Sequence, residues 1–279
     1  MRVLVTGANG QLGSELRLVA SADYLFTDVE ELDICSEDSV TEFVERNAID
    51  TIVNCAAYTN VDRAEEEPEV AKRVNATAVA ILARVARRHN ARLIHISTDY
   101  VFGGERFDAP IKEDQEPAPL GVYGRTKLLG ERAIVEAGCD YVIIRTSWLY
   151  STYGKNFVKT ILRLAAEREE LCVVNDQMGS PTYAKVLAGV IAQICENRDF
   201  ESGIYHYSNR GEISWCDFAR TVVELAGAEC RIKPCTTAEY GAKAPRPAYS
   251  VLDTSKICKA LGCEIPDWRD SLAECIKKM

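Results

Sequence analysis

The sequence predicts an α/β fold, a doubly wound parallel sheet with a smaller α/β lobe, on the basis of three observations. Apolar segments typical of strands alternate with amphipathic helical segments through the first half of the chain. A glycine-rich turn lies between the first of these strands and the first helix. Beyond residue 150 the alternation becomes less regular, which indicates the smaller lobe. Regular alternation favours right-handed crossovers and therefore a parallel sheet with helices on both faces.

The expected elements follow in chain order. In the first half, the predicted strands cover 2–6, 24–27, 51–55, 92–97 and 141–145, and the predicted helices cover 11–20, 37–46, 69–89 and 124–137. Ser36 before two acidic residues is typical of a helix N-cap. Segment 103–121, rich in Gly, Pro and charge, is predicted to be a loop. In the second half, we expect strands at 171–175, 203–207 and 230–234 and helices at 156–168, 184–197, 214–226 and 267–278.

Composition excludes several classes of partner. The chain has 279 residues, a net charge of -9 and no stripe of Lys and Arg, so we expect no binding to nucleic acid. No apolar run is long enough to span a bilayer, and the first residues do not resemble a signal peptide. The 11 cysteines form no CxxC motif and are expected to be reduced, mostly buried thiols. Together these features predict a cytoplasmic protein without a membrane partner.

The glycine turn predicts a dinucleotide site. Gly7 allows a tight turn, Gly10 lets the backbone approach a pyrophosphate, and Gly13 lets the helix pack on the strand. The phosphates would lie at a helix N-terminus, where free N–H groups and the helix dipole favour negative charge. The spacing is GxxGxxG rather than GxGxxG, so an ordinary strand–turn–helix remains the alternative. With this motif, the predicted fold is Rossmann-like.

Asp28 closes the second predicted strand, about twenty residues after the glycine turn. A carboxylate at this place can accept hydrogen bonds from the ribose hydroxyls of adenosine. It would repel a 2′-phosphate, and the residues that follow supply no compensating Arg. NADH is therefore favoured over NADPH, although a solvated loop acid would look the same in the sequence.

Tyr123 and Lys127 are spaced i, i+4 and would share one face of a helix. A nearby ammonium stabilises a phenolate and so lowers a tyrosine pKa from its usual value of about 10. Such a pair can donate a proton to the oxygen of a carbonyl that is being reduced. Thr98, at the end of the fourth predicted strand, could hydrogen-bond the same oxygen. YxxxK is common by chance, so the prediction depends on all three residues.

These motifs together resemble the extended short-chain dehydrogenase/reductase superfamily and, within it, the dTDP-4-dehydrorhamnose reductase family. The narrower resemblance rests on six strings that extend from near residue 1 to about residue 250. They are Thr6-Gly-Ala-Asn-Gly-Gln-Leu-Gly13, Asn54-Cys-Ala-Ala-Tyr-Thr59, Ser97-Thr-Asp-Tyr-Val-Phe102, Arg145-Thr-Ser-Trp-Leu-Tyr150, Asp176-Gln-Met-Gly-Ser-Pro-Thr-Tyr183 and Arg246-Pro-Ala-Tyr-Ser250. The last four are far more specific than YxxxK.

The resemblance implies a role for each matched position. A nicotinamide cofactor, NADH or NADPH, would be bound by Gly7, Gly10, Gln11, Leu12, Gly13, Asp28, Asp33, Ile34, Ala56, Ala57, Tyr58, Tyr123 and Lys127. Asp33 and Ile34 would flank the adenine, and Ala56, Ala57 and Tyr58 would line the side of the nicotinamide ribose. A nucleotide-sugar substrate would contact Thr98, Asp99, Trp148, Asn156, Gln177 and Arg246.

The implied reaction is hydride transfer to a C4 carbonyl of the sugar. Thr98, Tyr123 and Lys127 would be the catalytic residues: Tyr123 protonates the oxygen, Thr98 polarises the carbonyl and Lys127 tunes Tyr123. Trp148 would form a platform for the sugar, although it could instead belong to the core. Residues 1–147 and 170–200 are assigned to the cofactor-binding domain, and residues 148–169 and 201–279 to the substrate lobe.

Alternatives remain open at this stage. An epimerase or a 4,6-dehydratase could use the same fold, but a dehydratase usually has Asp-Glu directly after the threonine, and here Asp99 is followed by Tyr100. A non-catalytic binding subunit, like the regulatory subunit of methionine adenosyltransferase, is also similar to this family. Some bacterial members are magnesium-dependent dimers, but the acids they use near the C-terminus have no match here. Magnesium therefore remains possible without support from the sequence, no metal-binding residue is assigned, and a homodimer is left open.

Overall fold

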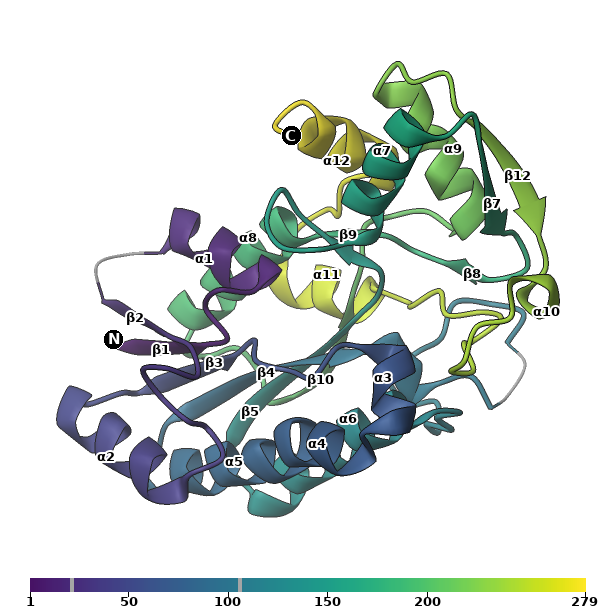
Figure 1. The fold of residues 1–279 in the computed structure, drawn as a ribbon. Helices are drawn as coiled ribbons and strands as arrows, with labels where there is room; N and C mark the ends of the chain where they lie inside the picture. The colour runs from purple at the N-terminus through teal and green to yellow at the C-terminus, as the bar shows by residue number, and fades with distance from the viewer. Residues whose placement is uncertain (21–22, 105–106) are drawn as a thin grey trace.

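The larger half of the molecule is built on a six-stranded sheet with the order β10-β5-β4-β3-β1-β2 (Figure 1). The computed structural model describes residues 1–20, 23–104 and 107–279, and all strand pairs in this sheet are parallel. The strands are β1 (Val3–Thr6), β2 (Tyr24–Thr27), β3 (Thr51–Asn54), β4 (Arg92–Thr98), β5 (Asp140–Thr146) and β10 (Gly203–Tyr207). The predicted α/β fold with a parallel sheet is confirmed.

Helices cover both faces of this sheet (Figure 1). One face packs against α1 (Gln11–Val19), α8 (Ala184–Glu196) and α11 (Ser255–Leu261), and the other against α2 (Glu37–Asn47), α5 (Ala78–Arg88) and α6 (Val122–Ala137). Successive side chains of a strand point to opposite faces. Thus Val3 and Val5 join one apolar core and Leu4 the other. Burial on both faces explains why these strands are continuously apolar in the sequence.

Helix starts and interruptions also have local causes. The predicted N-cap is confirmed, because the Ser36 side chain accepts a hydrogen bond from the Ser39 N–H. The helix predicted at 69–89 is divided into α4 (Pro68–Lys72), a π-helical segment (Arg73–Thr77) and α5. Within the π segment, the Asn75 side chain binds the backbone N–H and carbonyl of Tyr58. A preceding helix, α3 (Val61–Glu66), is not predicted by the sequence pattern.

The smaller half lies above the sheet in Figure 1 and has its own apolar core. Its strands pair in twos: β7 (Glu170–Val174) with β12 (Arg231–Cys235), β8 (Met178–Gly179) with β11 (Ile213–Ser214), and β6 (Leu149–Tyr150) with β9 (Thr182–Tyr183). Its helices are α7 (Phe157–Glu167), α9 (Trp215–Leu225), α10 (Thr237–Tyr240) and α12 (Trp268–Ile276). Strands of two residues leave almost no periodic signal, so they are absent from the prediction.

Two strands lie in a different half from the predicted one. The predicted division assigns β7, with residues 170–200, to the cofactor-binding domain, but β7 pairs with β12 in the smaller half. It assigns β10, with residues 201–279, to the lobe, but β10 pairs with β5 and forms the edge of the large sheet. The partner of a parallel strand can lie far away in the chain, so pairing is not visible in a local pattern. The rest of the proposed division remains a prediction.

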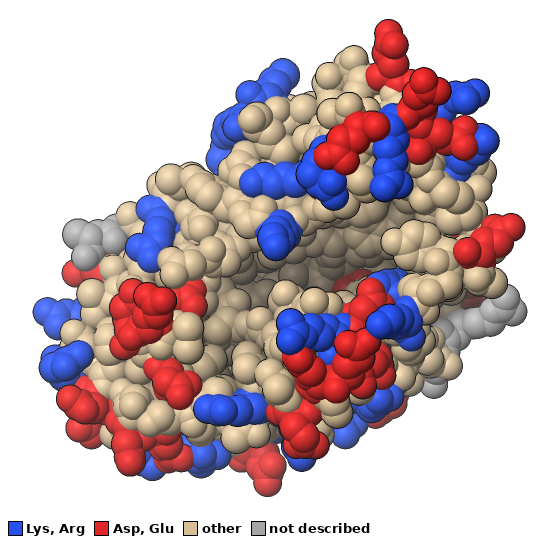
Figure 2. Space-filling view, viewed as in Figure 1, with Lys and Arg blue, Asp and Glu red and all other residues tan. Residues whose placement is uncertain are grey.

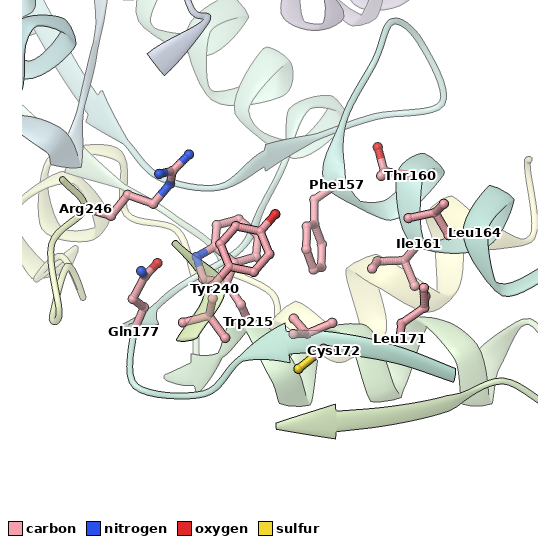
Figure 3. A pocket seen from close by; sticks show the side chains of 12 residues that line it. Phe157, Thr160, Ile161, Leu164, Leu171, Cys172, Gln177, Trp215, Tyr240 and Arg246 are labelled. Atoms are coloured by element: carbon pink, nitrogen blue, oxygen red, sulfur yellow. The ribbon is translucent and has the colours of Figure 1, made fainter. Parts of the chain in front are cut away.

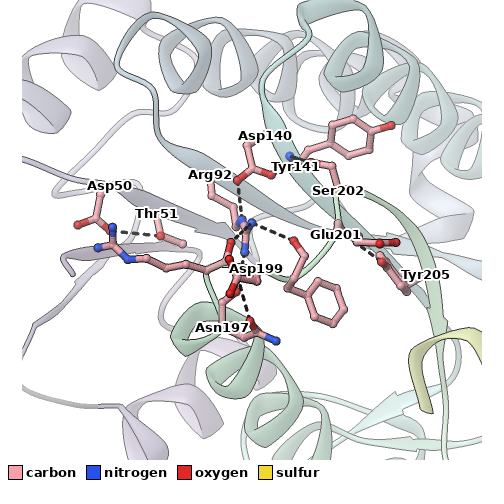
Figure 4. A network of polar contacts seen from close by, with 12 residues as sticks. Asp50, Thr51, Arg92, Asp140, Tyr141, Asn197, Asp199, Glu201, Ser202 and Tyr205 are labelled. Atoms are coloured by element: carbon pink, nitrogen blue, oxygen red, sulfur yellow. Dashed lines mark hydrogen bonds and ion pairs between the residues drawn. The ribbon is translucent and has the colours of Figure 1, made fainter. Parts of the chain in front are cut away.

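A polar network lies at the amino end of the large sheet, around the first residue of β4 (Figure 4). The Arg92 guanidinium donates to the Asp140 carboxylate at 2.7 Å. It also donates to the backbone carbonyls of Asn197, at 2.9 Å, and Phe200, at 2.9 Å. These contacts join β4 and β5 to the segment between α8 and β10 and so hold β10 in place.

Other sequence expectations can be compared directly with the structure. All 11 cysteines are free thiols; six are buried and Cys172 is exposed. Residues 105–106 of the predicted loop lie outside the described residues. Throughout residues 1–20, 23–104 and 107–279, no helix is both long and apolar enough to cross a membrane. The same residues contain no cluster of three or more His, Cys, Asp or Glu side chains suited to a metal ion.

Candidate active site

A cavity of about 650 Å³ lies between the two halves, beyond the carboxyl ends of the sheet strands. In Figure 2 the molecule is hollowed between the halves, and Lys and Arg side chains lie along the upper rim of the hollow. The strand order places β1 between β2 and β3, so chain connections leave in opposite directions on its two sides. Ligands of open α/β sheets bind in the crevice at such a point. The glycine turn begins there.

The glycine turn has the tight geometry expected of it. Gly7 has φ +66, and a Cβ on Gly7 would lie 2.6 Å from the Ala56 nitrogen. A Cβ on Gly13 would lie 2.6 Å from the Ala8 Cα, so the first turn of α1 packs tightly against the glycine turn. Gly10, the N-cap of α1, carries no side chain that could cover the helix terminus. The free N–H groups at the start of α1 are therefore available to an anion in the cavity.

Asp28 lies directly after β2 and contacts the glycine turn. Its Oδ2 atom accepts a hydrogen bond from the Asn9 N–H at 2.9 Å, and its Oδ1 atom accepts one from the Val29 N–H at 2.9 Å. The carboxylate thus lies next to the proposed pyrophosphate site, although it does not line the cavity itself. Among the ion pairs of the described residues, none involves Asp28, so no Lys or Arg neutralises it.

Thr98 and Tyr123 face the same cavity from β4 and α6. Burial raises the pKa of Tyr123 to about 12, with the Asp99 charge adding to the rise and a hydrogen bond with Thr98 opposing it. The Thr98 hydroxyl also lies 3.0 Å from Oδ1 of Asp99. Burial raises the pKa of Asp99 to about 6, and its Oδ2 atom has no hydrogen-bond partner within the described residues. A ligand in the cavity could supply that partner.

Lys127 also lines the cavity, but its amino group does not act on Tyr123 as expected. It donates to the Ile96 carbonyl at 2.7 Å and lies 3.2 Å from Nε2 of His95. Lys127 is not among the groups that shift the pKa of Tyr123, which rises instead of falling. The expectation of a lowered pKa is wrong for the free protein, because burial of the phenol is the largest effect on the pKa of Tyr123 and raises it.

Trp148 lies on the wall that the smaller half contributes. Its backbone has φ +48, and its indole stacks on Trp215 with ring centroids 3.5 Å apart and an angle of 11° between the planes. A Cβ on Gly179 would lie 2.6 Å from the indole, so the ring is held between Gly179 and Trp215. Both indoles line the cavity, so Trp148 belongs to the lobe core and to the cavity wall at once.

Asn156 joins the two walls at the start of α7. Its side chain caps α7 by accepting a hydrogen bond from the Lys159 N–H. Its amide nitrogen donates to Oε1 of Gln11 at 3.0 Å, and Gln11 is the first residue of α1. The start of α1 is therefore joined by a hydrogen bond to the start of α7.

Gln177 and Arg246 lie elsewhere, in a second cavity of about 270 Å³ within the smaller half (Figure 3). Its walls are mainly apolar and include Tyr240 and Trp215. The guanidinium of Arg246 donates to the Asp62 carboxylate at 2.8 Å, so the residue bridges the lobe and α3. Trp215 lines both cavities, so the indole separates the second cavity from the main one.

The main cavity thus brings together twelve of the predicted residues: Gly7, Gly10, Gln11, Leu12, Gly13, Ala57, Thr98, Asp99, Tyr123, Lys127, Trp148 and Asn156. Seven others do not line it. Gln177 and Arg246 line the second cavity, Asp28 contacts the turn, Ile34 is buried in an apolar core, and the rest are Asp33, Ala56 and Tyr58.

Sequence reasoning missed several lining residues, of which Trp215 and Lys155 are the most informative. Lys155 directly precedes Asn156, and a cation next to a residue predicted to contact a nucleotide sugar is a signal that could have identified it. Trp215 gives no such signal, because its contact with Trp148 depends on how distant segments of the smaller half pack together.

Comparison with known proteins agrees with this geometry. Residues 1–279 match the family model described as RmlD substrate binding domain. The chain is 42% identical over 280 residues to a dTDP-4-dehydrorhamnose reductase of Mycolicibacterium smegmatis, covering 99% of this chain and 85% of the relative. It is 42% identical over 284 residues to the Escherichia coli (strain K12) protein of the same name, covering 96% and 95%.

A solved structure extends the comparison to the fold. The dTDP-4-dehydrorhamnose reductase from Bacillus anthracis, in complex with NADP, superimposes with a TM-score of 0.95 at 39% sequence identity. The match covers 100% of this chain and 99% of that one. Family model, relatives and structure agree over the whole length, and the chain belongs to the RmlD substrate binding domain family.

Proposed function

We propose that this chain catalyses the NAD(P)H-dependent reduction of the C4 ketone of dTDP-4-dehydro-L-rhamnose to dTDP-L-rhamnose. The observation that carries the proposal is the main cavity, in which the hydroxyl groups of Thr98 and Tyr123 face the same space as the uncapped start of α1. Relatives covered over nearly their full length are named dTDP-4-dehydrorhamnose reductase, which supports the same reaction.

The residues at the glycine turn fit a dinucleotide. A side chain at Gly7 or Gly13 would collide with the backbone. Because glycine has none, the loop can stay close to the sheet, and the start of the helix stays open to a pyrophosphate. A bound nicotinamide would supply the hydride. We propose that the backbone from Gly10 to Leu12 binds the pyrophosphate and that Asp28 accepts from the adenosine ribose. Adenine contacts by Asp33 and Ile34, and ribose contacts by Ala56, Ala57 and Tyr58, remain proposals of the family resemblance.

Tyr123 is suited to protonate the ketone oxygen. With a pKa of about 12 its phenol keeps its proton at neutral pH, so it can donate as negative charge develops on the oxygen. Thr98 can donate a second hydrogen bond to the same oxygen, because its hydroxyl lies next to Tyr123. Lys127 would bind the nicotinamide ribose and orient the reacting groups.

The smaller half is proposed to bind the sugar nucleotide. The Trp148 and Trp215 pair offers an aromatic wall for the sugar, and the Asp99 carboxylate, which lines the same cavity, can accept from a sugar hydroxyl. Asn156, Gln177 and Arg246 are proposed for the nucleotide side. Arg246 suits a diphosphate because its planar fork can bind two oxygens, but it would first have to release Asp62.

The test measures how fast the purified chain oxidises NADH and NADPH in the presence of dTDP-4-dehydro-L-rhamnose. The absorbance of the reduced nicotinamide is the readout. We expect dTDP-L-rhamnose as the product and a higher kcat/KM with NADH, because the Asp28 carboxylate lies beside the glycine turn and forms no ion pair within the described residues. The Bacillus anthracis relative was solved with NADP, so the ratio of the two rates is informative. A folded, cofactor-binding protein that does not turn over this ketone would contradict the proposal.

Cellular location follows as a further proposal. The 11 free thiols suit a reducing compartment, and we propose the cytoplasm. Alkylating the thiols under denaturing conditions directly at lysis, and counting the alkyl groups on the protein by mass spectrometry, would test this. Recovery of oxidised pairs from intact cells would contradict it.

A further inference from the structure

Lys127 is buried, and among the described residues it has no counter-ion. Its side chain is 1% exposed, and its nearest carboxylate on α6 is that of Glu131. Glu131, however, is bound by the guanidinium of Arg145 at 2.7 Å. Within the described part of the chain, the ion pair at this place is Arg145–Glu131, and Lys127 forms none. A buried ammonium without a partner is costly, so the surroundings of its nitrogen decide its charge.

A chain of hydrogen bonds leads from the backbone after β3 to Lys127. The Ala56 N–H donates to Oδ1 of Asn54 at 3.1 Å, and the Thr6 hydroxyl donates to the same oxygen at 2.8 Å. A backbone N–H can only donate, so it fixes the orientation of the Asn54 amide. The amide nitrogen of Asn54 must then face Nδ1 of His95, from which it is 3.0 Å away.

This orientation determines the tautomer of His95. Burial lowers the pKa of His95 well below its ordinary value, so the imidazole is neutral and has one donor and one acceptor nitrogen. Because Nδ1 accepts from Asn54, the proton is on Nε2, which faces the Lys127 nitrogen at 3.2 Å. An ammonium group has only donors and would repel Nε2–H, whereas a neutral amine has a lone pair that accepts it.

We propose that His95 is a positioning residue that holds Lys127 as a neutral amine in the free protein at mildly alkaline pH, and that Lys127 takes up one proton from water when a nicotinamide dinucleotide binds. The step is protonation alone, from amine to ammonium, and no electrons move. It rests on the proposed function only in the identity of the ligand. The ammonium would then donate to the ribose hydroxyls instead of facing His95.

The electrostatic surroundings agree with this. Burial lowers the pKa of Lys127 to about 8, although Glu131 and Cys55 act in the opposite direction. The other titratable groups packed around it are His95 on β4 and Tyr123 on its own helix, and Tyr123 is uncharged at this pH. Lys127 is therefore the group among them that changes charge between neutral and alkaline pH.

The first test measures binding of NADH and of NADPH to the full chain from about pH 7 to about pH 9.5 by fluorescence. We expect the Kd to rise about tenfold per pH unit above about pH 8, because binding requires a proton that the free amine no longer holds. Calorimetry in two buffers of different ionisation enthalpy should show uptake approaching one proton at about pH 9. A flat Kd and no proton uptake would overturn the proposal.

His95→Gln tests the role of the imidazole. The amide can turn its oxygen toward Lys127, so the ammonium gains an acceptor and the midpoint of the pH profile should rise by about one unit, or about tenfold in affinity at alkaline pH. His206→Gln is the matched control, since His206 is also fully buried but bonds the Ile111 carbonyl instead. A His95→Gln profile identical to that of the wild type would contradict the proposal.

A third measurement needs neither ligand nor activity. The ¹⁵N resonance of the Lys127 amino group, in wild-type protein labelled at lysine and assigned by comparison with Lys127→Arg, should titrate near pH 8. A midpoint at or above about 10, the ordinary value, would overturn the proposal even if a variant failed to fold. Protein that shows this titration but does not reduce the sugar ketone would contradict the proposed function and leave this inference intact. Turnover with an ordinary lysine midpoint would do the reverse.

Discussion

The two walls of the main cavity are constructed differently. The wall from the large half consists of backbone and side chains at strand ends and helix starts, such as the glycine turn after β1 and Thr98 at the end of β4. The wall from the smaller half consists of aromatic side chains from separate segments, and its central contact is the stack of Trp148 on Trp215. One wall is defined by the chain's backbone, and the other by packing of side chains.

This difference predicts different responses to substitution. A backbone wall cannot adjust, because a Cβ at Gly13 or Gly7 meets other main-chain atoms. A side-chain wall can repack, so its substitutions should change substrate affinity in graded steps. Changes on the large half should therefore alter the chemistry, the stability or the cofactor affinity, and changes on the smaller half should mainly alter KM.

The largest effect is expected for Tyr123→Phe. Loss of the phenolic proton donor should reduce turnover at least about a hundredfold while leaving cofactor binding largely intact. Steady-state kinetics and fluorescence titration with NADH would measure both. Tyr150→Phe is a suitable control, because the hydroxyl of Tyr150 is buried with no hydrogen-bond partner in the described structure. Turnover by Tyr123→Phe near that of the control would remove the proposed role.

Gly13→Ala should destabilise the chain by about 2 kcal/mol and weaken cofactor binding, since the added methyl group would lie 2.6 Å from the Gly7 carbonyl oxygen. Gly189→Ala in α8 adds the same group where no atom beyond its chain neighbours and the local helix backbone lies within 4 Å, so it should be neutral or stabilising. Chemical denaturation of the two variants gives the comparison. Equal unfolding free energies would show that the backbone wall can adjust after all.

Trp215→Leu tests the side-chain wall. We expect the KM for the sugar nucleotide to rise about tenfold with kcat changed much less, because the residue supports Trp148 and not the reacting atoms. Trp268→Phe serves as the control, since Trp268 packs against Phe218 and lines neither cavity. A fall in kcat at unchanged KM would place the stack in the chemistry and weaken the contrast between the walls.

The smallest effect is expected for Asp28→Ala, at the outer end of the backbone wall. Removing the carboxylate should shift the ratio of kcat/KM values toward NADPH by a few-fold, because a repulsive charge near the 2′-position is lost. Asp38→Ala in the first turn of α2 removes an exposed charge elsewhere on the same half. An unchanged ratio would show that Asp28 does not determine the preference between NADH and NADPH.

The same contrast explains how much of the structure could be predicted. β1 to β5 match the prediction closely because most of their residues are buried and the apolar pattern is local. The π-helical segment at Arg73–Thr77 was not predictable, since it accompanies bonds between Asn75 and a loop before α3. In the lobe, two-residue strands and the pairing of β7 with β12 depend on contacts distant in the sequence.

In the candidate site, too, residues placed by local motifs could be predicted and residues placed by distant contacts could not. Gly7, Thr98 and Tyr123 could be predicted because strand–turn–helix motifs fix where such residues lie. Trp215 was missed, and Arg246 lies in the second cavity, because both are placed by the fold of the lobe. Lys127 was predicted, but the hydrogen bonds of its nitrogen were not, because His95 looks like any apolar-strand residue in the sequence.

The aromatic stack also gives the molecule an intrinsic optical reporter. The chain has three tryptophans, Trp148, Trp215 and Trp268, and all of them pack against the core of the smaller half. Tryptophan emission therefore arises from the smaller half alone. The two stacked indoles should show exciton coupling in circular dichroism, and a reduced nicotinamide in the same cavity would receive their excitation energy. Binding of a reduced nicotinamide at the wall of the large half could thus be followed through the tryptophan emission of the smaller half, in unmodified protein.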